Sequence, residues 1–198
     1  GDEEVFSTRQ FCEWFDLDHI TPSPAQISSD KLSWLNSHYL RCADSERLVS
    51  LVQPRLSARG VNVTSTPSLA AIVAVYRERV VNLNQLADAA AIFYLDLPPD
   101  PRLVAKHLAP EVLPVIADFV SRLPQVVWEA AAIGALIKEC VARHGVKLAK
   151  LAMPLRVLLC GQEQTPSVDA VLALFPRATV IDRLRRALSR WTGDTDAA

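Results

Sequence analysis

The chain has 198 residues, half of them hydrophobic, and a formal net charge of −1. A chain of this size can bury a real core, and it contains no apolar run of the about 18 residues that a membrane-spanning helix needs. Its four widely spaced cysteines form no Cys-x-x-Cys pair and no Cys/His cluster, which argues against a zinc site or a disulfide scaffold and favours reduced, mostly core cysteines.

The N-terminal segment begins with acidic residues and lacks the basic and apolar regions of a signal peptide. We therefore interpret residue 1 as a cut inside a longer chain. Ser7-Thr8-Arg9-Gln10 has the pattern of a capping box, which predicts a helix that carries Phe11, Trp14 and Phe15 on one face.

Apolar residues at helical spacing predict three more helices in the first half of the chain. One begins at Ser28 or Ser29 and runs through Leu40. Another spans residues 48–56 and stops near Gly60. Thr66-Pro67 predicts a further helix with proline at its first position. Residues 83–94 continue the same periodicity.

The Pro/Asp-rich residues 95–101 are the best candidate linker. Helices are predicted over 112–123 and 128–141, the second closed by His144-Gly145, because glycine adopts the left-handed cap conformation. Pro154 is expected to end or kink any helix there. A polar loop over 161–166 precedes the last two helices, over 166–175 and 178–191.

These elements predict an all-α fold of helix pairs joined by short loops, with no internal repeat. Trp14, Trp34 and Trp128 occur at core-like spacing and are interpreted mainly as packing residues.

Charge is unevenly distributed along the chain. Residues 1–46 are rich in acids, whereas residues 141–191 carry nine lysines and arginines against three acids. This asymmetry suggests an anionic partner at the C-terminal end, although a solvated basic helix face explains it equally well.

Motifs of catalysis are missing from the sequence: there is no Gly-rich phosphate loop, no His-Glu-x-x-His and no Gly-x-Ser-x-Gly. The four histidines are isolated from one another. The residues alone therefore indicate a helical domain with a basic C-terminal end, and they do not choose between RNA binding and protein interaction.

Three stretches carry a family resemblance. The first is Asp30-Lys31-Leu32-Ser33-Trp34-Leu35-Asn36-Ser37-His38-Tyr39; the second is Tyr76-Arg77-Glu78-Arg79; the third runs from Met153-Pro154-Leu155-Arg156 through Gly161 to Thr165-Pro166. In order and spacing they resemble the C-terminal part of bacterial glutamyl-tRNA synthetases, over essentially the whole chain.

The resemblance implies an anticodon-binding, two-part α-helical cage. Residues 1–45 would belong to a stem-contact region, 46–110 to the first helical subdomain and 111–198 to the second. The full-length parent would attach glutamate to tRNA with ATP and Mg²⁺. The His-Ile-Gly-His and Lys-Met-Ser-Lys-Ser motifs of that reaction are absent here, so no cofactor is expected in this chain.

The resemblance also implies site residues. Arg79 aligns with the arginine that reads the third anticodon base, C for glutamate and G for glutamine, and a guanidinium fork suits the acceptor edge of cytosine. Arg156 aligns with a contact to the first base. Thr165 and Pro166 align with contacts to the middle base, with Val168 beside them. Asp169 stands where some relatives have a stacking aromatic, which puts the middle-base contacts in doubt.

Backbone phosphates are expected to meet Arg143, Lys147, Lys150 and some of the terminal arginines. The expected partner is a glutamate-specific tRNA, with no DNA and no membrane, bound by a cytoplasmic monomer. Two alternatives stay open: a helical protein-interaction domain with no RNA role, and a synthetase that also charges glutamine tRNA.

Overall fold

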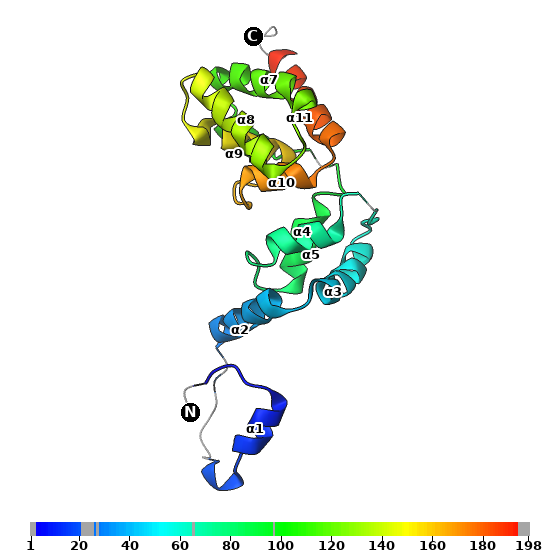
Figure 1. Ribbon diagram of the computed structural model, residues 1–198, viewed down its shortest axis with the longest axis vertical. Coiled ribbons are helices and arrows are strands. Elements are labelled where there is room, and N and C mark those ends of the chain that lie inside the picture. The colour runs from blue at the N-terminus through cyan, green and yellow to red at the C-terminus, as the bar shows by residue number, and fades with distance from the viewer. Residues whose placement is uncertain (1–2, 21–25, 27, 65, 97, 194–198) are drawn as a thin grey trace.

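The computed structural model describes residues 3–20, 26, 28–64, 66–96 and 98–193. Every regular element in those ranges is a helix, so the predicted all-α class is confirmed. The helices form an elongated molecule with α1 at one end, α2 to α5 in the middle and α6 to α11 at the other end (Figure 1). None of the described helices is long and apolar enough to cross a membrane.

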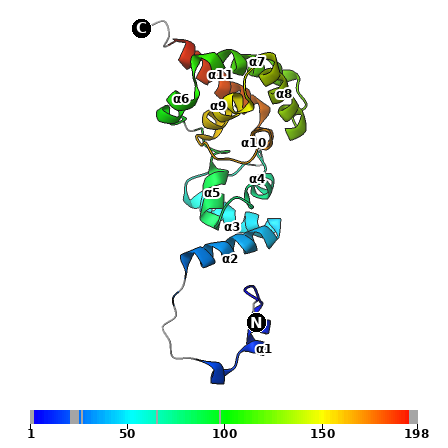
Figure 2. The same ribbon diagram turned by 90° about the vertical axis from the view of Figure 1, so that its left-hand side faces the viewer.

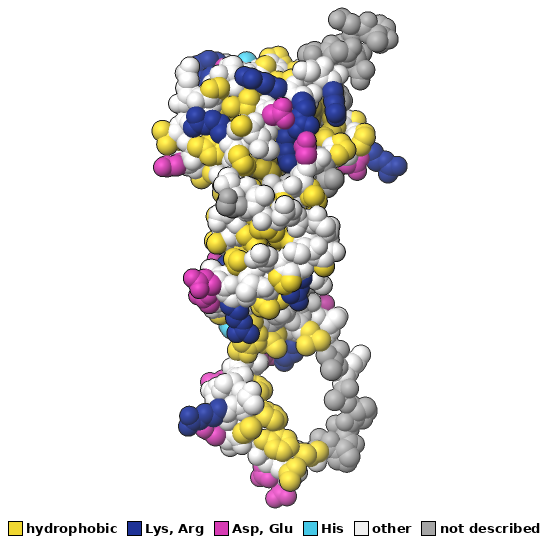
Figure 3. All heavy atoms as spheres, turned by 90° about the vertical axis from the view of Figure 1, so that its right-hand side faces the viewer, with side chains coloured by type: hydrophobic (Ala, Val, Ile, Leu, Met, Phe, Trp, Pro, Cys, Tyr) yellow, Lys and Arg dark blue, Asp and Glu magenta, His cyan; other side chains and the backbone are white. Residues whose placement is uncertain are grey.

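The N-terminal helices carry apolar side chains that remain exposed. Helix α1 (Thr8–Trp14) begins with the predicted capping box, in which the Ser7 hydroxyl accepts from the Gln10 amide. A 3-10 turn, η1 (Leu17–His19), follows. Phe6, Phe11, Trp14 and Phe15 stack on one another at the surface, and Figure 3 shows hydrophobic side chains gathered at this end.

Two of the predicted packing tryptophans are not in the core. Trp14 is 54% exposed and Trp34, on α2 (Ser29–Cys42), is 45% exposed. The prediction fails because periodicity identifies an apolar face but cannot show whether another element covers it. Trp128 does pack against the core, and its indole Nε1 donates to the Phe175 carbonyl at 2.8 Å.

Helices α3 (Ser45–Ala58), α4 (Leu69–Tyr76) and α5 (Leu83–Ala91) pack on one another and form what we call the first bundle. Helix α4 begins two residues later than predicted. Ser68 is its N-cap, with its hydroxyl accepting from the Ala71 amide, because a serine side chain caps a helix better than a proline can. Pro67 lies just before the helix, and its carbonyl accepts from the Tyr94 hydroxyl at 2.8 Å.

The remaining helices form the second bundle. They are α6 (Pro101–His107), η2 (Pro110–Val112), α7 (Leu113–Arg122), η3 (Leu123–Gln125), α8 (Ala130–Arg143), α9 (Leu148–Cys160), α10 (Val168–Leu174) and α11 (Arg177–Gly193). Figure 2 shows α6 at the edge of this bundle, and it packs on α9. Gly145 and Gly161 adopt the left-handed conformation where α8 and α9 end.

Helix α9 continues through Pro154, so the helix does not end at this proline, which was one of the two predicted outcomes. A proline inside a helix costs about 3 kcal/mol. However, Leu151, Leu155 and Leu158 of the same helix are buried, and each buried leucine contributes about 1.5–3 kcal/mol. Burial of this helix therefore outweighs the lost backbone hydrogen bond.

The two bundles share one hydrophobic core. Helix α4 of the first bundle contacts α10 of the second, and the ring of Phe93 lies 4.4 Å from the ring of Phe175. Arg183 of α11 reinforces the junction, because its guanidinium donates to the carbonyls of Leu95 and Leu159. The loops that follow α4 and α9 are therefore held in a fixed relation to each other.

Candidate nucleic-acid interface

A cleft of about 300 Å³ lies where the two bundles meet. One wall comes from the end of α4 and from α5. The other comes from residues 161–167, which connect α9 to α10 and which we call the cleft loop. The lining residues include Tyr76, Arg79, Asp88, Gln164, Thr165 and Pro166. The cleft thus brings together three predicted site residues, Arg79, Thr165 and Pro166, although Arg79 and Pro166 are almost 90 positions apart in the sequence.

Arg79 is the exposed cation of the first wall. It lies in the turn after α4, where its backbone amide bonds the Tyr76 carbonyl at 2.9 Å. The other arginine of the same motif, Arg77, is engaged elsewhere, because its guanidinium donates to the carbonyl of Ala43 at 2.6 Å and to that of Arg41. Arg77 therefore stabilises the fold, whereas Arg79 faces the cleft.

Tyr76 lies at the back of the same wall. Its hydroxyl is buried and has no hydrogen-bond partner within the part of the chain that the structure describes. Burial raises the pKa of Tyr76 well above its ordinary value, so the phenol is neutral at physiological pH. Its ring packs edge-on against Phe93, which connects this wall to the interbundle core.

Asp88 of α5 is the acidic member of the first wall. Arg59 at the end of α3 pairs with it, with the arginine Nε 2.9 Å from the carboxylate oxygen Oδ1. This ion pair offsets the negative charge of Asp88, and Arg79 remains the cation that an RNA would meet in the cleft.

The second wall is organised by Arg156 of α9. Its Nε donates to the Thr165 hydroxyl at 3.0 Å, and that hydroxyl also donates to the Pro166 carbonyl at 2.9 Å. The terminal nitrogens of Arg156 lie 3.5 Å from the Met153 sulfur and 3.5 Å from the Pro166 carbonyl oxygen, which is a long contact for an oxygen acceptor. Arg156 does not line the cleft itself, but it fixes two residues that do and keeps donors for a further partner.

Val168 and Asp169 begin α10. Val168 is only 9% exposed and packs in the core, so it supports the cleft loop from below. Asp169 lies against Gly134 of α8, where an added Cβ would meet its carboxylate at 3.2 Å. The carboxylate that replaces a stacking aromatic therefore occupies space that the glycine of α8 leaves open.

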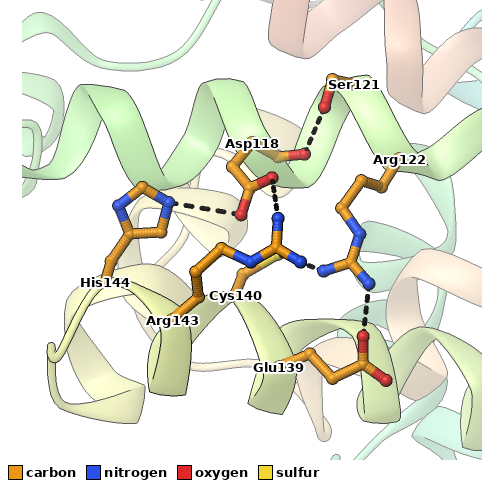
Figure 4. A network of polar contacts seen from close by, with 7 residues as sticks. All are labelled: Asp118, Ser121, Arg122, Glu139, Cys140, Arg143 and His144. Atoms are coloured by element: carbon orange, nitrogen blue, oxygen red, sulfur yellow. Dashed lines mark hydrogen bonds and ion pairs between the residues drawn. The ribbon is translucent and has the colours of Figure 1, made fainter.

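The predicted backbone-contact residues lie at the junction of α8 and α9. Arg143 reaches Asp118 of α7 at 3.4 Å, and His144 reaches the same carboxylate at 3.2 Å (Figure 4). Lys150 lies 3.4 Å from Glu111. Lys147 is exposed at the N-cap of α9. The ion pairs of Arg143 and Lys150 are long and involve exposed cations, so a phosphate can compete for these groups.

Three arginines of α11, Arg177, Arg183 and Arg186, bond to other parts of the protein. Arg183 and Arg186 pair with Asp96, Arg186 also pairs with Asp182, and Arg177 donates to the carbonyls of Pro124 and Val126. Figure 3 shows basic and acidic side chains intermixed over the upper part of the molecule. A larger cavity of about 540 Å³ beside α11 is lined by Arg183, Arg186 and Arg190, of which the first two pair with Asp96.

Glu163 is a cleft-loop residue that the sequence did not single out. Its carboxylate accepts from Lys106 Nζ at 2.6 Å and contacts His107 Nε2 at 2.5 Å, both on α6. The partners are more than 50 positions away in the chain, so no local pattern could have indicated the contact. The bonds from Lys106 and then His107 hold the pKa of Glu163 below its ordinary value.

That lowered pKa predicts a pH-dependent contribution to stability. A carboxyl with a lowered folded pKa stabilises the protein above its unfolded pKa of about 4.3 and stops doing so as the pH falls through the folded value. We expect Glu163→Gln to lower the urea midpoint at pH 6–7, and we expect the difference from the unmodified chain to shrink as the pH falls below about 4.3. Urea titrations across pH 3–7 check this, and a difference independent of pH would contradict it.

Cysteines and metal ligands add no further site. All four cysteines are free; Cys140 and Cys160 are buried, whereas Cys12 and Cys42 are exposed, so only half of them occupy the predicted core positions. No group of three or more His, Cys, Asp or Glu residues in the described ranges could hold a metal ion.

The fold and the cleft define an all-helical binding domain with arginines at the meeting point of two bundles. The family described as "Anticodon binding domain" matches residues 47–188, which is most of the chain, and the chain belongs to this family.

The chain is also 50% identical over 188 residues to a glutamate--tRNA ligase of Thiobacillus denitrificans and 53% identical over 180 residues to that of Dechloromonas aromatica. The two alignments include 95% and 91% of this chain, but only 40% and 39% of the length of the two relatives. The resemblance noted from the sequence is therefore confirmed, and the chain spans about 40% of the length of these relatives.

A solved structure shows the same fold. The glutamate tRNA ligase of Elizabethkingia meningosepticum aligns with a TM-score of 0.84 over 94% of this chain and 37% of its own, at 22% sequence identity.

Proposed function

We propose that the chain binds the anticodon arm of a glutamate-specific tRNA and reads its unpaired bases in the interbundle cleft. The observation that carries the proposal is the convergence of Arg79 with Thr165 and Pro166 in one cleft. Proteins read RNA sequence mainly on splayed, single-stranded bases, and arginine supplies a planar fork of donors for a base edge.

Each wall of the cleft has its own task in this proposal. Arg79 donates to the acceptor edge of the third anticodon base, cytosine. Thr165 and Pro166 contact the middle base, and the spare N–H groups of Arg156 reach the first base. Arg143, Lys147 and Lys150 contact backbone phosphates of the anticodon arm.

The longer protein to which this segment would belong is proposed to be a cytoplasmic glutamate--tRNA ligase that uses ATP and Mg²⁺. Similarity to whole ligases supports this, although the chain covers only about 40% of them. We propose that it acts as a monomer on tRNA and not on DNA.

A protein-contact role is a second candidate, favoured by the exposed aromatic cluster of Phe6, Phe11, Trp14 and Phe15. This cluster surrounds α1, at the opposite end of the molecule from the second bundle (Figure 1). If the chain has only this protein-contact role, RNA binding should not depend on the anticodon sequence.

Fluorescence anisotropy with a labelled glutamate-tRNA anticodon stem-loop tests the proposal. At about 100 mM salt we expect it to bind at least tenfold more tightly than a hairpin of equal length with a scrambled loop. Equal binding of the two hairpins would leave only non-specific attraction and would favour the protein-contact role.

The backbone contacts predict a salt dependence. Lys147→Gln and Lys150→Gln should each reduce the slope of log K against log salt concentration by about 1, and should weaken cognate and scrambled hairpins alike. The control is Lys138→Gln, which removes an exposed lysine of α8 that is not assigned to the interface. Unchanged slopes in the first two variants would remove these lysines from the interface.

A further inference from the structure

We propose that Glu163 is a positioning residue: by anchoring the cleft loop to α6, it sets discrimination at the middle anticodon base. The inference rests on the proposed function and adds a residue that makes no contact with RNA itself. Glu163 does not line the cleft, whereas its neighbours Gln162 and Gln164 do.

The anchor joins two elements across the second bundle. Lys106 and His107 form the last turn of α6, and both reach the same oxygen, Oε1 of Glu163, at 2.6 Å and 2.5 Å. The His107 side chain is 16% exposed and that of Glu163 is 33% exposed, so the contact is partly shielded from water. Hydrogen bonds between ionised partners are shorter and stronger than neutral ones.

The cleft loop is held at two points. Residues 161–167 form neither helix nor strand, and Gln162 and Gln164 are exposed. Its second anchor is the bond from Arg156 Nε to the Thr165 hydroxyl, which comes from α9. Glu163 and Thr165 are thus held from two different helices, and the residues that face the cleft lie between and beside these anchors.

This arrangement predicts a loss of specificity confined to one base. Thr165 and Pro166, which face the middle base, depend on the anchored loop. Arg79, which faces the third base, is on the opposite wall, and its turn is fixed by the Tyr76 carbonyl in the first bundle. Loosening the loop should therefore blunt middle-base selection and leave third-base selection intact.

The test uses two variants that change charge in opposite directions. Glu163→Gln removes a negative charge, and the double variant Lys106→Met/His107→Leu removes both α6 groups that hold Glu163, including the positive charge of the lysine, so their effects on overall RNA affinity should differ in sign. Both break the same anchor. The matched control is Glu139→Gln, which breaks the ion pair between α8 and Arg122 of α7 in the same bundle (Figure 4).

Each protein is titrated with three stem-loops: cognate, middle base changed from U to C, and third base changed from C to G. Circular dichroism first shows that each variant is folded. In the unmodified chain we expect about tenfold discrimination at each position. Both anchor variants should reduce middle-base discrimination to below about threefold and keep third-base discrimination within twofold of the unmodified chain, whereas Glu139→Gln should change neither.

The outcomes separate this inference from the proposed function. If the unmodified chain discriminates but the anchor variants do so equally well, or lose both discriminations together, the positioning role is wrong. If only Glu163→Gln has the effect, Glu163 acts on RNA directly and not through α6, which also overturns the inference. If the unmodified chain discriminates at neither base, the proposed function fails, and the positioning role falls with it.

Discussion

Phe175→Ala is expected to lower the free energy of unfolding by about 3–5 kcal/mol, the largest effect of any single change considered for this chain. Phe175 is 1% exposed and lies between the bundles. Its ring packs 4.4 Å from Phe93, and the Arg183 guanidinium lies over it at 5.1 Å. Among the described ring contacts, the Phe93–Phe175 contact is the only one that joins the first bundle to the second, and we call it the aromatic bridge. Alanine at position 175 would leave a cavity there.

Urea denaturation followed by circular dichroism measures this change. The control is Phe11→Ala, because Phe11 is 46% exposed and should contribute less than about 1 kcal/mol. Since the same bridge fixes the separation of the cleft walls, we also expect weaker binding of the anticodon stem-loop. A loss of stability no larger than that of Phe11→Ala would mean that the bundles are not held together through this ring.

Arg156→Met is expected to weaken stem-loop binding by about tenfold or more, equivalent to about 1.4 kcal/mol or more. Methionine keeps much of the apolar length of the side chain but removes every donor. The Thr165 hydroxyl loses the bond from Arg156 Nε, and the spare guanidinium N–H groups are lost with it.

Thr165→Val separates these two losses. Valine has the shape of threonine without the hydroxyl, so it removes the bond to Arg156 and leaves the guanidinium in place. We expect it to weaken binding less than Arg156→Met does. Arg47→Met, which changes an exposed arginine of α3 that is not assigned to the interface, controls for net charge. Equal effects of Arg156→Met and Arg47→Met would reduce Arg156 to a non-specific cation.

Local signals in the sequence predicted local structure well. The Ser7 capping box, the Ser28 cap of α2 and the glycine end of α8 all depend on side chains or dihedrals within a few residues. Trp34 was misjudged, and the sequence left open whether a helix ends at Pro154, because both outcomes depend on distant elements. For Pro154, buried leucines outweigh a lost hydrogen bond; for Trp34, no described element covers the ring.

The candidate site shows the same division. The family motifs placed Arg79, Thr165 and Pro166 as site residues, and the fold brings all three to one cleft. The sequence could not show that Arg77 is bound to backbone carbonyls while Arg79 is exposed, because both lie in the same short motif. Nor could it show Glu163 bonded to α6, since contacts across more than 50 positions are a product of the tertiary fold.

Selection of the third anticodon base by Arg79 is the central claim. Anisotropy titrations at about 100 mM salt would compare the cognate stem-loop with one carrying G in place of the third-position C, for the unmodified chain and for Arg79→Ala. We predict that the unmodified chain prefers C by at least about 1 kcal/mol and that Arg79→Ala abolishes the preference without unfolding the chain. Equal binding of both RNAs to the unmodified chain, or a preference that survives Arg79→Ala, would contradict the assignment.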